Sequence, residues 1–183
     1  TDTEPSIWRA YSMVNGPDQT PLEFYSIVVP EGEFSPRLAA LNPGDTIYID
    51  NTVFGFLTAD RFEPGGTLWM IATGTGLSAY LSMLNDPATW AAFDQIILIH
   101  GVRTKDELAY SEEIRQWQAD SGTQALPAKF VYLAIPTREP MPGVPQERIT
   151  TLIENGELEK LAHCPSDPDR NKIMLCGNPE MLA

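Results

Sequence analysis

Residues 67–79, TLWMIATGTGLSA, decide the fold. An apolar run of β-forming residues leads into a glycine-rich turn, and a helical pattern begins at Gly76. Gly74-x-Gly76-x-x-Ala79 after a buried strand is typical of a turn that binds a dinucleotide. Its small residues let the backbone approach a pyrophosphate, whose charge faces the free N–H groups of the helix start. A tight strand–helix turn without a ligand is the alternative interpretation.

The alternation of strand and helix continues towards the end of the sequence. The predicted strands are 67–72, 95–100, 129–134 and 172–176. Three helices are predicted: the first begins at Gly76, the second spans 105–119 and the third spans 146–155. Pro179-Glu180-Met181 follows the last strand. Strands that are apolar throughout and separated by helices indicate a parallel sheet covered on both faces, an α/β domain.

The first third of the sequence has a different pattern. Alternating residues at 7–12, 22–29 and 45–49, separated by turn-rich segments, predict antiparallel strands. Between them, Ser35-Pro36 predicts a short helix with serine as the N-cap and proline at the first position. Because the pattern changes at 62–66, we predict two domains, 1–63 and 64–183.

Composition limits the classes of partner. The net charge of −13 argues against nucleic acid and anionic membrane surfaces. No apolar run is long enough to cross a bilayer, so a cytoplasmic protein is expected. We also expect a monomer. Cys164 and Cys176 have no Cys/His spacing typical of zinc, so no metal site is predicted, and His100 and His163 are interpreted as structural.

Basic residues follow the second and third predicted strands. Arg103 comes after the second strand, Arg138 after the third, and Arg148 lies in the next helix. An NAD site usually carries an acid at the end of the second strand, whereas cations there suit a 2′-phosphate. The sequence therefore favours NADP over NAD; ordinary surface salt bridges are the alternative for each arginine taken singly.

Arg9-Ala10-Tyr11-Ser12 places a cation and an aromatic ring on one face of a predicted strand. Arginine can hold a phosphate with a fork of donors, and a tyrosine ring can cover a flat heterocycle. Taken alone, this tetrapeptide is also compatible with an ordinary strand.

Six segments together resemble the bacterial ferredoxin/flavodoxin–NADP reductases, which are FAD enzymes. The segments are RAYSMVN (9–15), LEFYSIVV (22–29), FSPRLAALNPGD (34–45), ATGTGLSAYLSML (72–84), HGVRTKDELAY (100–110) and MLCGNPEML (174–182). The resemblance implies an antiparallel FAD-binding β-barrel in residues 1–63 and a parallel-sheet NADP-binding domain in residues 64–183. It also implies electron transfer between NADPH and a ferredoxin or flavodoxin, through hydride exchange between nicotinamide C4 and flavin N5.

The resemblance also implies the residues of the site. Those implied for FAD are Arg9, Ala10, Tyr11, Ser12, Tyr25, Ser26, Ile27, Val28, Glu33, Phe34, Ser35 and Thr75. Those implied for NADP are Gly74, Gly76, Val102, Arg103, Thr137, Arg138, Arg148, Cys176 and Gly177. Three of them are implied in catalysis: Tyr11 packing on the isoalloxazine, Ser12 hydrogen-bonding near flavin N5, and Cys176 approaching the nicotinamide.

The sequence departs from the family in three ways. Ala79 replaces a usual proline, and Glu33 stands where relatives often carry lysine. The family's barrel has six strands, and those before Arg9, like its C-terminal segment, have no counterpart here, so we expect a longer polypeptide and weak FAD binding by this chain alone. Two alternatives stay open: the reductase component of an oxygenase, and a non-catalytic nucleotide-binding module that has lost its flavin.

Overall fold

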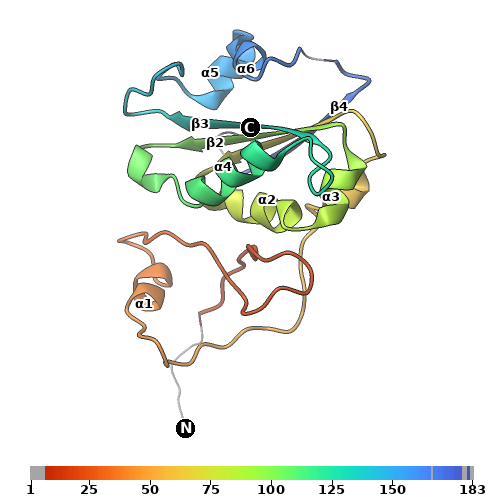
Figure 1. Cartoon of the computed structure of the whole chain (residues 1–183). Coiled ribbons are helices and arrows are strands. Elements are labelled where there is room, and N and C mark those ends of the chain that lie inside the picture. The colour runs from red at the N-terminus through yellow and green to blue at the C-terminus, as the bar shows by residue number, and fades with distance from the viewer. Residues whose placement is uncertain (1–6, 166, 179–180, 182–183) are drawn as a thin grey trace.

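Four parallel strands form the central sheet of the structure, a computed structural model that describes residues 7–165, 167–178 and 181 (Figure 1). The strands are β1 (Thr67–Thr73), β2 (Gln95–Val102), β3 (Lys129–Pro136) and β4 (Asn171–Cys176). Their order in the sheet is β3-β2-β1-β4, and β1 pairs in parallel with both β2 and β4. This confirms the predicted parallel sheet and each of its four strands. The end of the last resembling segment, Pro179-Glu180 and Leu182, lies outside the described residues.

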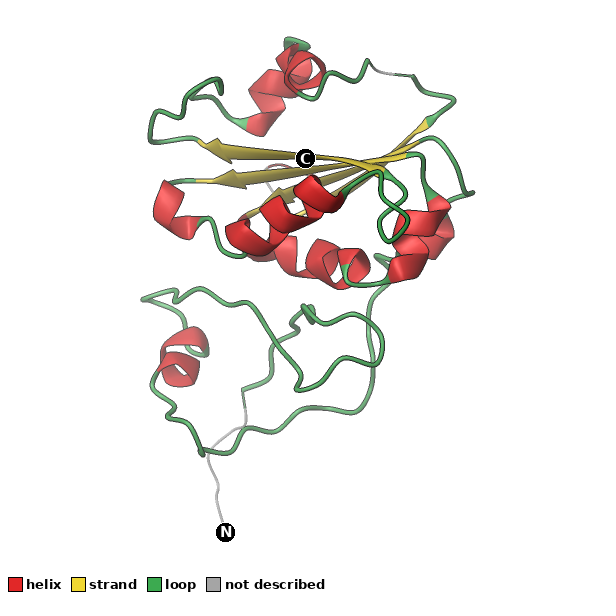
Figure 2. Ribbon diagram, viewed as in Figure 1, coloured by secondary structure: helices red, strands yellow, loops and turns green. Residues whose placement is uncertain are grey.

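Helices pack on the two faces of this sheet (Figure 2). One face meets α2 (Leu77–Leu84), α3 (Pro87–Ala92) and α4 (Ser111–Asp120), and the other meets α5 (Ile149–Glu154) and α6 (Glu157–Leu161).

Alternate side chains of a strand enter different cores because the side-chain period of a strand is two. In β1, Leu68 and Met70 pack on the α2 side, whereas Trp69 and Ile71 pack on the α5 side. The second face is incompletely covered at its β4 edge, where Ile173 and Leu175 are 57% and 39% exposed. The prediction of a sheet covered on both faces is confirmed, except at these two side chains of β4.

Two predicted helices differ from the observed elements. The helix predicted over 105–119 is a 3-10 turn, η3 (Lys105–Glu107), followed by α4. Tyr110 separates them with φ +58°, which a right-handed helix cannot contain. The helix predicted over 146–155 begins only at Ile149, and Gly156 at φ +72° separates α5 from α6.

Sequence reasoning missed α3. Its signal was present: the Asp86 carboxylate accepts a hydrogen bond from the Ala88 N–H at 2.9 Å, and Pro87 is the first helical residue. Both are typical of a helix start.

The segment before β1 is irregular. Within residues 7–66 the structure contains α1 (Ser35–Ala39), a 3-10 turn, η1 (Ala59–Arg61), and one isolated antiparallel bridge between Met13 and Phe24. The strands predicted at 7–12, 22–29 and 45–49 are therefore wrong, and the described residues form no barrel. A strand needs a neighbour to take its N–H and C=O groups, and alternation of side chains alone does not supply one.

This segment is attached to α2 near its beginning. Val14 is only 3% exposed and belongs to the core that contains α2. The Ser82 hydroxyl donates to the Asn15 carbonyl, and the Asn85 amide donates to the Val14 carbonyl. The irregular segment therefore has a fixed point of contact with the helices beneath the sheet.

Candidate functional site

The glycine turn at the end of β1 combines an open position with a closed one. Gly74 has φ +53°, and no atom lies within 4 Å of where a Cβ would be. A Cβ on Gly76, in contrast, would lie 2.3 Å from the Cys176 carbonyl oxygen. Gly74–Gly76 is a 3-10 turn, η2, so the α-helix begins at Leu77 rather than at Gly76. Gly74 leaves room for a ligand, while Gly76 lets the turn pack against the end of β4.

His100 forms a hydrogen bond with the backbone of this turn. Its side chain is fully buried, and Nε2 lies 3.0 Å from the Gly74 carbonyl oxygen. Burial lowers the pKa of His100 from its usual 6.5 to about 4, so the ring is neutral at neutral pH and Nε2–H donates to Gly74. Nδ1 is buried without a hydrogen-bond partner among the described residues. Sequence analysis interpreted His100 as structural, because only the tertiary contact with Gly74 reveals its place at the site.

The ends of β2 and β3 stay paired beyond the strands themselves. The Thr137 N–H and hydroxyl both donate to the Val102 carbonyl, at 2.9 and 3.1 Å, and the Arg138 N–H donates to the Arg103 carbonyl at 2.9 Å. The structure thus brings Arg103 and Arg138, both predicted from the sequence, to adjacent backbone positions.

Arg148 is held at the same edge by packing. It is the N-cap residue of α5, and it precedes Ile149, which is 3% exposed. A Cβ on Gly101 would lie 2.6 Å from Ile149 Cδ1, so this glycine lets α5 approach the end of β2.

Cys176 and Gly177 complete the edge at β4. Cys176 pairs with Ala72 and is half-buried, and burial raises the pKa of its thiol, which is therefore protonated at neutral pH. Gly177 has φ +148°, and a Cβ there would lie 2.0 Å from the Thr73 hydroxyl oxygen. That oxygen also accepts the Asn178 N–H at 2.8 Å.

Thr75 lies in the middle of the glycine turn. It is half-buried, and its carbonyl accepts a hydrogen bond from the Ser78 hydroxyl at 3.0 Å. The turn is thereby tied to the first turn of α2.

Apart from Thr75, the residues predicted for FAD lie in the irregular segment before β1. The Tyr11 ring lies 5.8 Å from that of Phe34, and its hydroxyl is 3.1 Å from the Ser26 hydroxyl. The Arg9 guanidinium lies 3.6 Å from the Glu33 carboxylate. Ala10, Ser12, Ile27 and Val28 are exposed around them. Among the described residues, no hydrogen bond or ring contact joins this group directly to the glycine turn.

Ser35 differs from its predicted role. Phe34, not Ser35, occupies the N-cap position of α1 and makes no side-chain cap. Ser35 is the first helical residue, and its hydroxyl accepts a hydrogen bond from the Val29 N–H at 2.9 Å. The side chain therefore fastens the 25–29 segment to α1 instead of capping the helix.

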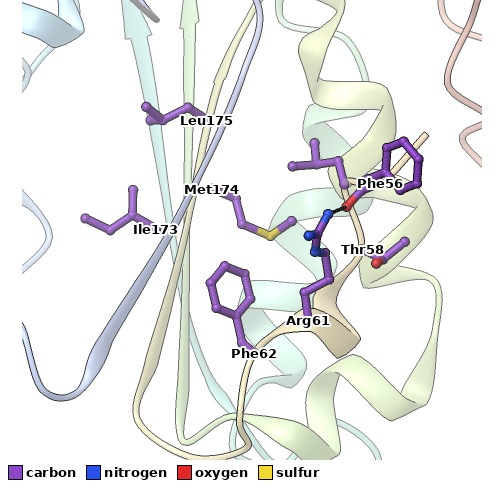
Figure 3. Close-up of a pocket in the computed structure, with 8 residues that line it drawn as sticks. Phe56, Thr58, Arg61, Phe62, Ile173, Met174 and Leu175 are labelled. Carbon is purple, nitrogen blue, oxygen red and sulfur yellow. Dashed lines mark hydrogen bonds between the residues drawn. The ribbon is translucent and has the colours of Figure 1, made fainter.

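Two grooves lie away from these residues. One of about 300 Å³ runs along β4 and is lined by Phe56, Leu57, Thr58, Arg61, Phe62 and residues 173–175 (Figure 3). Arg61 is engaged there, because its guanidinium donates to the Phe56 carbonyl at 3.0 Å. The other, about 310 Å³, lies at the amino ends of the strands, next to Thr67, Gln95, Lys129 and Asn171. Neither groove is lined by a predicted site residue.

Two kinds of feature are absent from the described part of the chain. It holds no group of three or more His, Cys, Asp or Glu side chains placed to bind a metal ion. Nor does it hold a helix with the length and apolar character that a membrane span requires.

Comparison with known proteins identifies the family. Residues 70–183 match the family described as the oxidoreductase NAD-binding domain. The chain is 38% identical to the flavodoxin/ferredoxin–NADP reductase of Escherichia coli K12 and 37% identical to the ferredoxin–NADP reductase of Pseudomonas aeruginosa. Each match covers 96% of this chain and 69% of the relative.

A solved structure gives the same result. The ferredoxin–NADP⁺ reductase of Neisseria gonorrhoeae, determined with bound FAD and NADP, superposes with a TM-score of 0.87 at 34% identity. The match covers 96% of this chain and 68% of that one. This chain therefore belongs to the flavodoxin/ferredoxin–NADP reductase family.

Proposed function

We propose that this chain is an FAD-dependent oxidoreductase that passes electrons between NADPH and a ferredoxin or flavodoxin. The observation that carries the proposal is the joining of the glycine turn, the two arginine-bearing strand ends and Cys176 along one edge of the sheet. Family membership supports it, because relatives with these names cover nearly the whole chain. When bound, the cofactors supply the chemistry: a hydride exchanged between nicotinamide C4 and flavin N5, and single electrons given to the carrier.

The nucleotide side fits NADP in three respects. The open space outside Gly74 suits a pyrophosphate close to the backbone, next to the start of α2. Arg103 and Arg138 lie next to each other along the backbone, and two arginines at this edge suit a 2′-phosphate. The Cys176 thiol is uncharged at neutral pH and adds no negative charge near the nicotinamide position assigned by the resemblance.

The flavin side fits less completely. Tyr11 is 36% exposed and presents an aromatic ring, which suits a flat heterocycle. Arg9, the proposed pyrophosphate ligand, is paired with Glu33, and this acid opposes binding of a diphosphate. We propose that residues 1–63 bind FAD and residues 64–183 bind NADP. The ion pair between Arg9 and Glu33 weakens the binding of FAD.

Cofactor specificity tests the proposal. The purified chain, supplied with excess FAD and kept anaerobic, is expected to lose its visible flavin absorbance with NADPH and much more slowly with NADH. Arg103→Ala together with Arg138→Ala is expected to raise KM for NADPH roughly tenfold or more, because two charge-assisted contacts to phosphate are lost. Kinetics with NADH should change little.

Lys129→Ala is the control, since it removes one exposed cation at the opposite end of β3. It should leave both cofactors unaffected. Equal losses with NADPH and NADH in the arginine variants would mean that these arginines support the fold or the pyrophosphate instead. A chain that never takes up FAD would contradict the flavin assignment.

A further inference from the structure

We propose that Glu107 is a positioning residue that orients the Arg103 guanidinium towards a 2′-phosphate. Both oxygens of its carboxylate bind the same arginine. Oε2 accepts the Arg103 backbone N–H at 2.9 Å, and Oε1 accepts the side-chain Nε–H at 2.9 Å. Since the backbone N–H follows directly from β2, the carboxylate ties the guanidinium to the sheet. The inference rests on the proposed NADP function.

This pairing leaves the other edge of the guanidinium available. Among the described residues, the two terminal amino groups of Arg103 make no hydrogen bond, and its side chain is 58% exposed. A guanidinium carries five N–H donors in a planar fork, and holding Nε fixes the direction of the remaining four. An arginine already held in its binding orientation loses less conformational freedom when an anion arrives.

Glu107 is itself held from the flavin side. It is the last residue of η3, and its backbone carbonyl accepts a hydrogen bond from the Tyr25 hydroxyl at 3.3 Å. The Tyr25 ring packs edge-on against Tyr110, with 5.8 Å between centroids. Tyr25 belongs to the segment proposed to line FAD, so one residue joins that segment to the proposed phosphate-binding arginine.

The Glu107 side chain is also less exposed than the arginine that it binds. It is 28% exposed, against 58% for Arg103. Glu107 is therefore held at two points, its carboxylate by Arg103 and its backbone carbonyl by the Tyr25 hydroxyl, as an orienting residue requires.

Simple electrostatics predicts the opposite effect for a carboxylate at this place. A negative charge next to Arg103 repels a phosphate and neutralises part of the arginine's charge, so its removal would strengthen phosphate binding. If orientation dominates, its removal weakens binding although the site becomes more positive. The direction of the change therefore separates the two roles.

Calorimetric titration of the 183-residue chain with 2′-phospho-AMP, and with 5′-AMP for comparison, measures this direction. Glu107→Gln keeps an acceptor for the Arg103 backbone N–H but loses one for Nε–H. It is expected to raise the Kd for 2′-phospho-AMP about three- to tenfold and to leave 5′-AMP unchanged. Asp106→Asn removes the same charge from the exposed neighbouring residue and is expected to leave binding unchanged or slightly tighter.

Arg103→Ala completes a double-mutant cycle. If Glu107 acts through Arg103, Glu107→Gln has no further effect in the Arg103→Ala background. Tighter or unchanged binding in Glu107→Gln would overturn the inference, as would equal losses for 2′-phospho-AMP and 5′-AMP, which would indicate a general structural role. If Arg103→Ala itself leaves 2′-phospho-AMP binding unchanged, the arginine site in the proposed function fails, and the inference fails with it.

Discussion

At the scale of single residues, His100 makes the stability of the chain depend on pH. The folded pKa, about 4, lies below the usual 6.5, so the unfolded chain binds a proton that the folded chain does not. This contribution to stability is complete above pH 6.5 and is lost as the pH falls towards 4. Its loss between pH 7 and pH 5 lowers the free energy of unfolding by about 2 kcal/mol. Urea unfolding at the two pH values should show this loss, and His100→Gln should reduce it.

His163→Gln provides the matched control, because His163 is exposed and the substitution is the same. It should keep the pH dependence of the unsubstituted chain. If His100→Gln and His163→Gln change the pH dependence equally, the buried imidazole is not its source.

At the scale of elements, the contact between the glycine turn and β4 requires Gly76. Gly76→Ala would place a Cβ 2.3 Å from the Cys176 backbone oxygen, so the turn or the strand must move. Overpacking of this kind costs about 1–3 kcal/mol. Faster amide hydrogen exchange along β4 (Asn171–Cys176) is the expected result. Gly143→Ala is the control, because it imposes backbone strain at φ +77° but its Cβ would contact no other residue. It should leave amide exchange in β4 unchanged. Equal exchange in the two variants would argue against the packing explanation.

At the scale of the whole molecule, Val14 fastens the irregular segment to the sheet domain. Figure 1 shows this segment beneath α2 and α3, and Val14 is buried in the core that includes α2. Val14→Ala is expected to cost about 2 kcal/mol at this contact, by lost burial and a residual cavity. Limited proteolysis followed by mass spectrometry should show cleavage within residues 7–63 about thirtyfold faster, with the sheet still protected.

Val29→Ala is the control for this variant, since Val29 is 50% exposed. Its cleavage pattern should match that of the unsubstituted chain. Simultaneous loss of protection in both parts of Val14→Ala would mean that the segment and the sheet unfold as one unit.

Much of the sheet domain could be predicted from the sequence alone. The apolar runs of β1 to β4, each followed by a helix or turn, indicate a parallel sheet, because strands that are apolar throughout are typical of a sheet with helices on both faces. One face of β4 departs from this pattern, with Ile173 and Leu175 exposed. The glycine turn after β1, the arginines after β2 and β3, and Cys176 at the end of β4 were each predicted from the sequence, and the structure places them at one edge of the sheet. Parallel strands bring their carboxyl ends together whatever the details of packing.

Tertiary structure alone decided the rest. The strands predicted before residue 63 did not form, because pairing depends on a partner segment and not on alternation within one segment. The pairing of Arg9 with Glu33, the hold of Glu107 on Arg103 and the position of His100 beneath Gly74 each depend on how side chains meet after folding. A sequence names the groups that can carry charge or donate a hydrogen bond; the distances and burial that select their partners exist only in the folded chain.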